Sequence, residues 1–121
     1  MGLQSTILVV DDDEALGMTL AQALRSLGHF VVYHPNPREA LRLLGLIPPD
    51  LVITDILMPG MDGFEVIQAY QGKSKIVAMS AGQRIDGATY LRMAEQLGAV
   101  ATIQKPFSLD EFISLVVPLL D

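Results

Sequence analysis

A small set of side chains in this sequence could together handle a phosphoryl group. Four consecutive acids occupy positions 11–14, and a further carboxylate, Asp55, directly follows an apolar run. Ser80 offers a hydroxyl group and Lys105 offers an ammonium group. Carboxylate oxygens without histidine or cysteine among them favour a hard cation, Mg²⁺ before Zn²⁺. A metal ion and an ammonium group can neutralise phosphoryl oxygens while a carboxylate between them acts as nucleophile and forms an acyl phosphate.

Each of these residues follows a short apolar run that is typical of a buried strand. The five runs are 6–10, 30–33, 51–54, 75–79 and 100–104. Apolar residues at helical spacing fill the segments between them, so the sequence predicts an α/β fold with a doubly wound parallel sheet buried on both faces. Right-handed crossovers bring the carboxyl ends of such strands to one edge. Asp11, Asp55, Ser80 and Lys105 should therefore meet at that edge.

Capping signals mark where several helices begin and end. Gly28 should end the first helix, because glycine is the usual residue just past a helix C-terminus. Asn36 and Glu39 predict a capping box at the start of the second helix, and Ser108 and Glu111 predict another at the start of the last. These signals support the alternation of strands and helices along the whole chain.

Each candidate residue also has a plain structural explanation. Acids suit the N-terminus of a helix, which fits Asp13 and Glu14 better than the two acids that end the first strand. A serine after a strand is common, and a lysine before a proline can lie on the surface. The joint pattern favours a site, because a suitable group follows four of the five strands. Several carboxylates in one crevice should also raise at least one carboxyl pKa unless a cation lies among them.

The composition excludes several classes of function. The chain has 121 residues, the size of one domain, and no cysteine, which excludes a disulfide scaffold, a thiolate zinc site and a cysteine nucleophile. A net charge of −6 disfavours direct nucleic-acid binding, which needs clustered cations. No apolar run has the length of a membrane span and no signal-peptide pattern opens the chain, so we expect a cytoplasmic protein without a membrane partner. His29 and His34 are expected at the surface or at strand ends, without a catalytic part.

Four segments of the chain resemble the bacterial two-component response-regulator receiver domain, the CheY-like domain. The segments are 7–13, 55–63, 79–81 and 105–107. Their order and spacing extend the resemblance over essentially the full length. It implies a single receiver domain over residues 1–121, with a (βα)5 flavodoxin-like sandwich and a parallel five-stranded sheet in the order 2-1-3-4-5.

The resemblance implies a role for each matching side chain. Asp55 would accept the phosphoryl group, and Ser80 would donate a hydrogen bond to it. Lys105 would pair with Asp55 and then with a phosphoryl oxygen. The peptide bond between Lys105 and Pro106 is expected to be cis, which would direct the lysine into the site.

Mg²⁺ is the cofactor that the resemblance implies. Asp12 would hold it directly, Asp11 partly through water, and Leu57 through its backbone carbonyl. Asp13 matches a position that has no catalytic duty.

The implied function is that of a phosphoacceptor in a two-component or phosphorelay system. The phosphoryl donor would be a sensor histidine kinase or a histidine phosphotransfer protein, and the downstream partner would be a protein. Catalysis would be limited to the chain's own phosphorylation and dephosphorylation. With no output domain in 121 residues, we expect a free-standing receiver or one excised from a hybrid kinase. Met1 and a last helix that runs to Asp121 favour the free-standing form.

Two departures from the family pattern fall on the side used for output. Thr102 stands where the family often has Tyr or Phe, three residues before the lysine, so the side chain on which an aromatic switch depends is missing. The segment 82–87 after Ser80 is longer than in common receivers. Extra length should make the loop over the phosphorylated site more mobile or reshape the surface that a partner contacts.

Two other functions share part of this pattern. A haloacid-dehalogenase-like phosphatase would use Asp11 as its nucleophile with Mg²⁺, in an Asp-x-Asp motif after a strand. That family prefers Thr or Val where this chain has Ala15, and its core and cap need a longer chain. A flavodoxin-like flavin binder needs a phosphate loop rich in Ser and Thr, whereas this chain has the acids 11–14 there.

Overall fold

Five parallel strands form the predicted sheet. The computed structural model describes residues 4–36, 38–39, 42, 48–56, 63–81 and 87–120. The strands are β1 (Thr6–Val10), β2 (Phe30–His34), β3 (Leu51–Asp55), β4 (Lys75–Ala81) and β5 (Ala101–Lys105). They pair in the order β2-β1-β3-β4-β5, each pair parallel. The predicted strand order and parallel pairing are confirmed.

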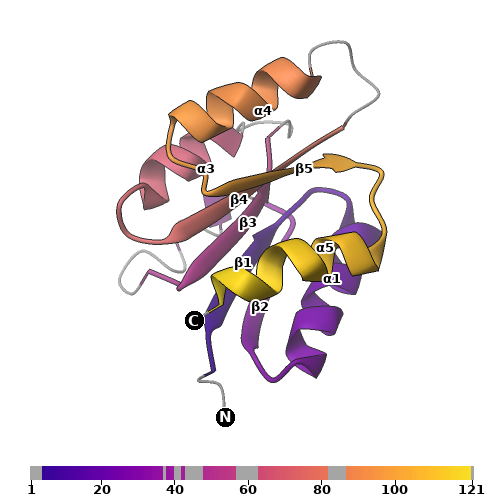
Figure 1. Ribbon diagram of the computed structural model, residues 1–121. Helices are drawn as coiled ribbons and strands as arrows, with labels where there is room; N and C mark the ends of the chain where they lie inside the picture. The colour runs from indigo at the N-terminus through magenta and orange to yellow at the C-terminus, as the bar shows by residue number, and fades with distance from the viewer. Residues whose placement is uncertain are drawn as a thin grey trace.

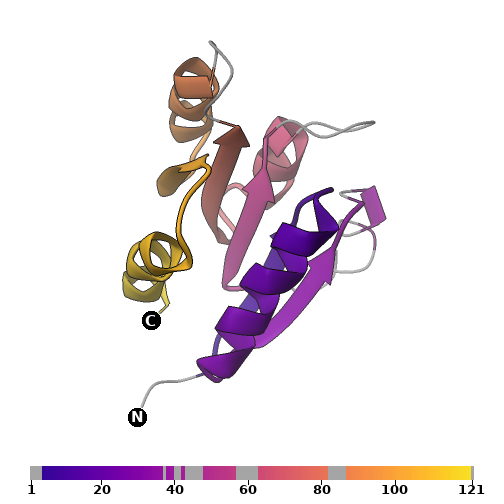
Figure 2. The same cartoon turned by 90° about the vertical axis from the view of Figure 1, so that its right-hand side faces the viewer.

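Helices cover both faces of this sheet. The helices α1 (Glu14–Ser26) and α5 (Leu109–Val116) lie on one face, and α3 (Gly63–Tyr70) and α4 (Gly87–Gln96) lie on the other (Figures 1 and 2). A short 3₁₀ turn, η1 (Val117–Leu119), follows α5. Among the described residues, no helix combines the length and apolar character needed to cross a bilayer.

Side chains of the central strands alternate between two apolar clusters. In β1, Ile7 and Val9 pack with residues of α1 and α5, whereas Leu8 and Val10 pack with residues of α3 and α4. All four side chains are fully buried. Successive residues of a strand point to opposite faces, so a central strand covered on both sides is apolar throughout. This two-sided burial explains why continuous apolar runs marked the strands.

Four strands end later than the apolar runs predict, β2 and β3 by one residue each, at His34 and Asp55. The strand β4 extends to residue 81 and β5 extends to residue 105. Ser80 and Lys105 therefore lie within strands, and Ser80 pairs with Gln104 in the β4–β5 ladder. Backbone pairing continues beneath polar side chains at the sheet edge, where the apolar pattern has already stopped. The backbone positions of both candidate residues are therefore set by strand register.

Two of the predicted helix boundaries are confirmed. Gly28, just after α1, has a φ of 95°, a conformation that glycine adopts without a side-chain penalty. The Ser108 hydroxyl accepts a hydrogen bond of 3.0 Å from the backbone N–H of Glu111 at the start of α5. Local sequence signals were sufficient at both ends because the contacts join residues within one turn.

The capping box predicted at Asn36 and Glu39 was half wrong. The Asn36 side chain does accept hydrogen bonds from backbone N–H groups, including that of Glu39. The backbone N–H of Asn36, however, donates to Nδ1 of His34 at 3.1 Å. The Glu39 carboxylate pairs instead with Arg42. The last residue of β2 thus accepts the hydrogen bond from the backbone N–H that the capping box would have used. Most of the helix predicted beyond Asn36 lies outside the described residues.

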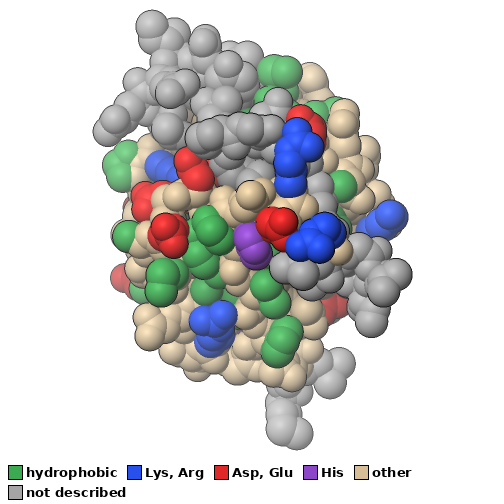
Figure 3. All heavy atoms as spheres, turned by 180° about the vertical axis from the view of Figure 1, so that it is seen from behind, with side chains coloured by type: hydrophobic (Ala, Val, Ile, Leu, Met, Phe, Trp, Pro, Cys, Tyr) green, Lys and Arg blue, Asp and Glu red, His purple; other side chains and the backbone are tan. Residues whose placement is uncertain are grey.

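Charged side chains are dispersed over one face of the molecule (Figure 3). On the face turned away from the viewer in Figure 1, the described lysines and arginines lie scattered among acidic and apolar side chains (Figure 3). His29 directly precedes β2 and His34 ends it, as predicted, and each accepts a hydrogen bond from a backbone N–H. Both histidines therefore make hydrogen bonds that stabilise the local backbone.

The helix α5 anchors the segment that leaves β5. The Lys105–Pro106 peptide bond is cis, which confirms the prediction. The ring of Phe107 stacks on that of Phe112, with ring centroids 5.8 Å apart and an interplanar angle of 17°. Phe112 is fully buried in the cluster beneath α1 and α5. The chain is thus tied to the core two residues after Lys105.

We expect Phe112→Ala to lower the free energy of unfolding by about 3–5 kcal/mol, because it leaves a cavity in the core and removes the partner of Phe107. Urea denaturation measures the change. Leu109→Ala in the same helix is the matched control: this side chain is 44% exposed, so the loss should be below about 1 kcal/mol. Equal losses in the two variants would contradict this account of the core.

Candidate functional site

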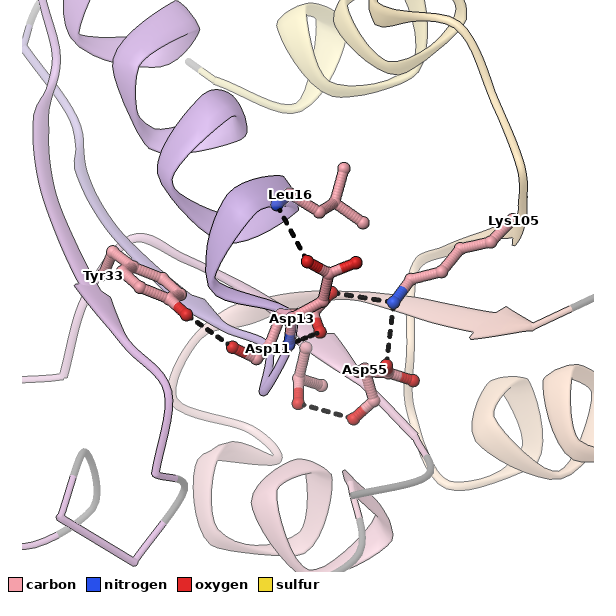
Figure 4. A network of polar contacts seen from close by, with 7 residues as sticks. Asp11, Asp13, Leu16, Tyr33, Asp55 and Lys105 are labelled. Atoms are coloured by element: carbon pink, nitrogen blue, oxygen red, sulfur yellow. Dashed lines mark hydrogen bonds and ion pairs between the residues drawn. The ribbon is translucent and has the colours of Figure 1, made fainter. Parts of the chain in front are cut away.

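The carboxyl edge of the sheet brings three of the predicted residues into contact. Asp11 follows β1, Asp55 ends β3 and Lys105 ends β5. Figure 4 shows the lysine reaching between the two acids, with its Nζ atom 2.8 Å from Oδ2 of Asp11 and 2.8 Å from Oδ2 of Asp55. The predicted convergence of these residues is confirmed. The contact with Asp11 is an addition, because only Asp55 was expected as a partner of the lysine.

Three carboxylates at this edge lie close enough to share a cation. One oxygen each from Asp11, Asp12 and Asp55 lies within 4.8 Å of the others. Asp11 is fully buried and Asp55 is buried, whereas Asp12 is exposed. Mg²⁺ prefers oxygen ligands and keeps several of its waters, so a group of carboxylates open to solvent on one side suits it. Leu57, the third expected ligand, lies outside the described residues.

Lys105 supplies the positive charge that these acids need. Burial by itself would lower the pKa of Lys105, but its hydrogen bonds and ion pairs with Asp11 and Asp55 outweigh burial and raise that pKa. Burial raises the pKa of Asp11 to about 6, against the opposing effect of the lysine. The predicted rise of a carboxyl pKa is thus confirmed at Asp11. Repulsion from Asp55 contributes to this rise, as predicted, but loss of solvent has a larger effect.

Local hydrogen bonds order the acidic segment after β1. The backbone N–H of Asp13 donates to Oδ1 of Asp11 at 2.9 Å. The Asp13 carboxylate accepts a hydrogen bond of 3.2 Å from the backbone N–H of Leu16, so it caps α1 (Figure 4). Glu14 lies in the first turn of that helix. The structural explanation given for Asp13 and Glu14 is therefore confirmed, and the other two acids remain as candidate metal ligands.

Ser80 lies near the carboxyl edge of the sheet and has a hydroxyl group that no described residue bonds. Met79 is opposite Asp55 in the β3–β4 ladder, so Ser80 lies one residue further toward the carboxyl edge. Its Oγ atom is buried and has no hydrogen-bond partner within the described part of the chain. Buried polar groups are nearly always paired, so an unpaired one at a candidate site indicates a hydroxyl that can bond to a ligand oxygen.

Two hydroxyl contacts at this edge were missed at the level of the sequence. The Tyr33 hydroxyl donates a hydrogen bond of 2.7 Å to the backbone carbonyl of Asp11 (Figure 4). Burial raises the pKa of Tyr33 to about 12, so this hydroxyl stays protonated at neutral pH. The Thr54 hydroxyl donates to the backbone carbonyl of Asp55 at 2.9 Å. Both residues fit the pattern of a buried strand, and nothing in the sequence around them indicates that their hydroxyl groups bond to these carbonyls.

Comparison with known proteins places this geometry in one family. A family model described as the response regulator receiver domain matches residues 7–117. The DNA-binding transcriptional regulator NtrC of Escherichia coli K12 is 34% identical over 91% of this chain, which spans 24% of that regulator. The chain thus has about a quarter of the length of such relatives. Sporulation initiation phosphotransferase F of Bacillus subtilis is 29% identical, over 90% of this chain and 88% of that protein.

Solved structures agree with the sequence relatives. A response regulator receiver protein from Burkholderia phymatum is 31% identical and superposes with a TM-score of 0.84, covering 97% of this chain and 95% of that one. These findings give no support to the haloacid-dehalogenase-like alternative. The strand order, the acids and lysine at the carboxyl edge and the family match lead to one assignment: the chain belongs to the response regulator receiver domain family.

Proposed function

We propose that this chain accepts a phosphoryl group on Asp55 and that residues 1–121 form one receiver domain. Receiver domains are signalling modules, and the proposed donor is the phosphohistidine of a sensor histidine kinase or of a histidine phosphotransfer protein. The observation that carries the proposal is the contact of Lys105 with both Asp11 and Asp55, at 2.8 Å from each. It joins a nucleophile, a charge-compensating cation and a candidate metal ligand in one site.

Phosphoryl transfer needs a carboxylate that can attack phosphorus and a nearby positive charge that balances its negative charge. In the proposed step an oxygen of Asp55 attacks the phosphorus atom, the P–N bond to the donor histidine breaks, and that nitrogen keeps the bonding electrons. Lys105 stays beside the acceptor and offers positive charge to the transferred oxygens. When bound by Asp11, Asp12 and the backbone carbonyl of Leu57, Mg²⁺ would neutralise further charge on those oxygens. Ser80 donates its unused hydroxyl hydrogen to a phosphoryl oxygen.

The biological setting is proposed from the family. The chain acts in the cytoplasm, and its catalysis is limited to its own phosphorylation and dephosphorylation. Phosphorylation changes the surface that binds a downstream protein. Thr102 is half-buried in β5 and pairs with Ala78 of β4, so the output side carries a small polar residue at a position often aromatic in the family.

We expect Asp55→Asn to abolish phosphorylation, because an amide oxygen cannot act as the acceptor. Intact-protein mass spectrometry after incubation with acetyl phosphate measures the adduct, with and without MgCl₂. The wild type should gain a single phosphoryl group only when Mg²⁺ is present. Asp110→Asn, in the exposed first turn of α5, should behave as the wild type. An adduct that persists in Asp55→Asn would contradict Asp55 as the acceptor.

We expect Ser80→Ala to separate function from stability. The buried hydroxyl has no partner among the described residues, so its removal should change the free energy of unfolding by less than about 0.5 kcal/mol or raise it. Phosphorylation by acetyl phosphate should slow about tenfold or more, because a hydrogen bond to a charged oxygen is lost. Urea denaturation and the rate of adduct formation give the two readouts. A clear loss of stability at an unchanged rate would assign Ser80 to the fold instead.

We expect Lys105→Met to strengthen Mg²⁺ binding while phosphorylation slows. The lysine and the metal ion would compete for the same two carboxylates, so removal of the lysine should tighten Mg²⁺ binding by about threefold or more. Calorimetric titration of the metal-free protein with MgCl₂ measures the affinity. Lys73→Met removes the same charge near the opposite edge of the sheet, where β4 begins, and should leave the affinity nearly unchanged. Unchanged or weaker Mg²⁺ binding in Lys105→Met would count against this competition.

A further inference from the structure

Tyr33 links the edge strand to the acidic segment after β1. It lies in β2 opposite Val9 of β1, and its ring packs against the apolar cluster shared by α1 and α5. From there its hydroxyl reaches the backbone carbonyl of Asp11, 2.7 Å away (Figure 4). The Tyr33 side chain thus connects β2 to the segment that carries the candidate metal ligands Asp11 and Asp12.

Gly17 makes this path possible. A Cβ atom built on Gly17 would lie 2.1 Å from Cε1 of Tyr33 and 2.7 Å from Cδ1 and Cζ. The ring therefore rests directly against the backbone of α1, and any side chain at position 17 would displace it. Glycine within a helix costs up to about 1 kcal/mol relative to alanine. The close approach of the ring accounts for a glycine at this buried helical position.

The carbonyl that Tyr33 contacts belongs to the peptide unit between the two candidate metal ligands. The peptide plane that contains the Asp11 carbonyl also contains the backbone nitrogen of Asp12, so it joins the two candidate metal ligands. Its neighbours are already held, since the Asp13 N–H donates to Asp11 and the Asp13 carboxylate caps α1. The tyrosine hydroxyl holds the carbonyl side of this plane. A displacement of this peptide unit would move both carboxylates relative to Asp55.

We infer that Tyr33 is a positioning residue for the metal site, and that Gly17 provides the space it needs. The inference rests on the proposed function, because it concerns Mg²⁺ binding by Asp11 and Asp12. Hydrogen bonds that orient metal ligands raise affinity by reducing the freedom that the ligands lose on binding. The Tyr33 hydroxyl bonds to the backbone carbonyl of Asp11, so its effect on the metal site passes through the Asp11 backbone.

Tyr33→Phe tests this role, because it removes one oxygen and keeps the ring in place. Titration of the metal-free protein with MgCl₂, followed by NMR shifts of backbone amides, should show a Kd about 3- to 10-fold higher than in the wild type. Amide hydrogen exchange at Asp13 should also become faster in the metal-free variant. Tyr70→Phe is the matched control, because the Tyr70 hydroxyl is buried and has no partner among the described residues. Its Mg²⁺ affinity should equal that of the wild type.

Three results would overturn the inference or the part of it that concerns Gly17. A lower thermal stability of Tyr33→Phe with an unchanged Mg²⁺ Kd would make Tyr33 a structural residue only. Gly17→Ala should weaken Mg²⁺ binding in the same way, because the displaced ring cannot reach Asp11, and wild-type affinity in that variant would remove Gly17 from the account. A wild-type chain that binds no Mg²⁺ would instead overturn the proposed metal site, and the inference with it.

Discussion

The site depends on one lysine held between two buried carboxylates. Asp11 and Asp55 have almost no contact with water, and each contributes an oxygen 2.8 Å from Nζ of Lys105. Buried negative charge without a counterion destabilises a fold, so the positive charge of the lysine is what allows both acids to be buried at this edge. The lysine is 94 residues from one acid and 50 from the other along the chain. Only the order of the parallel strands brings the three groups together.

That strand order also decides where polar chemistry can occur. The strands β1 and β3 are central, and apolar clusters cover both of their faces. A carboxylate in the middle of either strand would be buried without a partner. The first positions that tolerate an acid are at the carboxyl ends of these strands, where Asp11 and Asp55 are found. Packing therefore places the charged site at the edge of the sheet. The stacking of Phe107 on Phe112 of α5 fixes the end of β5, the strand that carries the lysine.

The groups around the charge cluster differ in how the fold uses them. Asp13 caps a helix, and Thr54 and Tyr33 bond to backbone carbonyls of the two buried acids. These contacts order the segments that carry the carboxylates. Ser80 makes no such contact with any described residue, although its hydroxyl is buried. The supporting groups are thus all paired, whereas one buried donor is unpaired. This combination is expected where a site is already arranged to bind a ligand with several oxygen atoms.

Much of the fold and the candidate residues could be predicted from the sequence because the signals are local. Apolar runs marked the strands, Gly28 and Ser108 marked helix boundaries, and the groups after four strands indicated phosphoryl chemistry. Contacts between distant segments could not be predicted in this way. Tertiary structure decided that Asp11 is buried while Asp12 is exposed, that Lys105 contacts Asp11, and that burial raises the pKa of Asp11. It also brought Tyr33 against Gly17. Periodicity records which residues are buried, whereas these pairings depend on strand register and helix packing, which no short stretch of sequence contains.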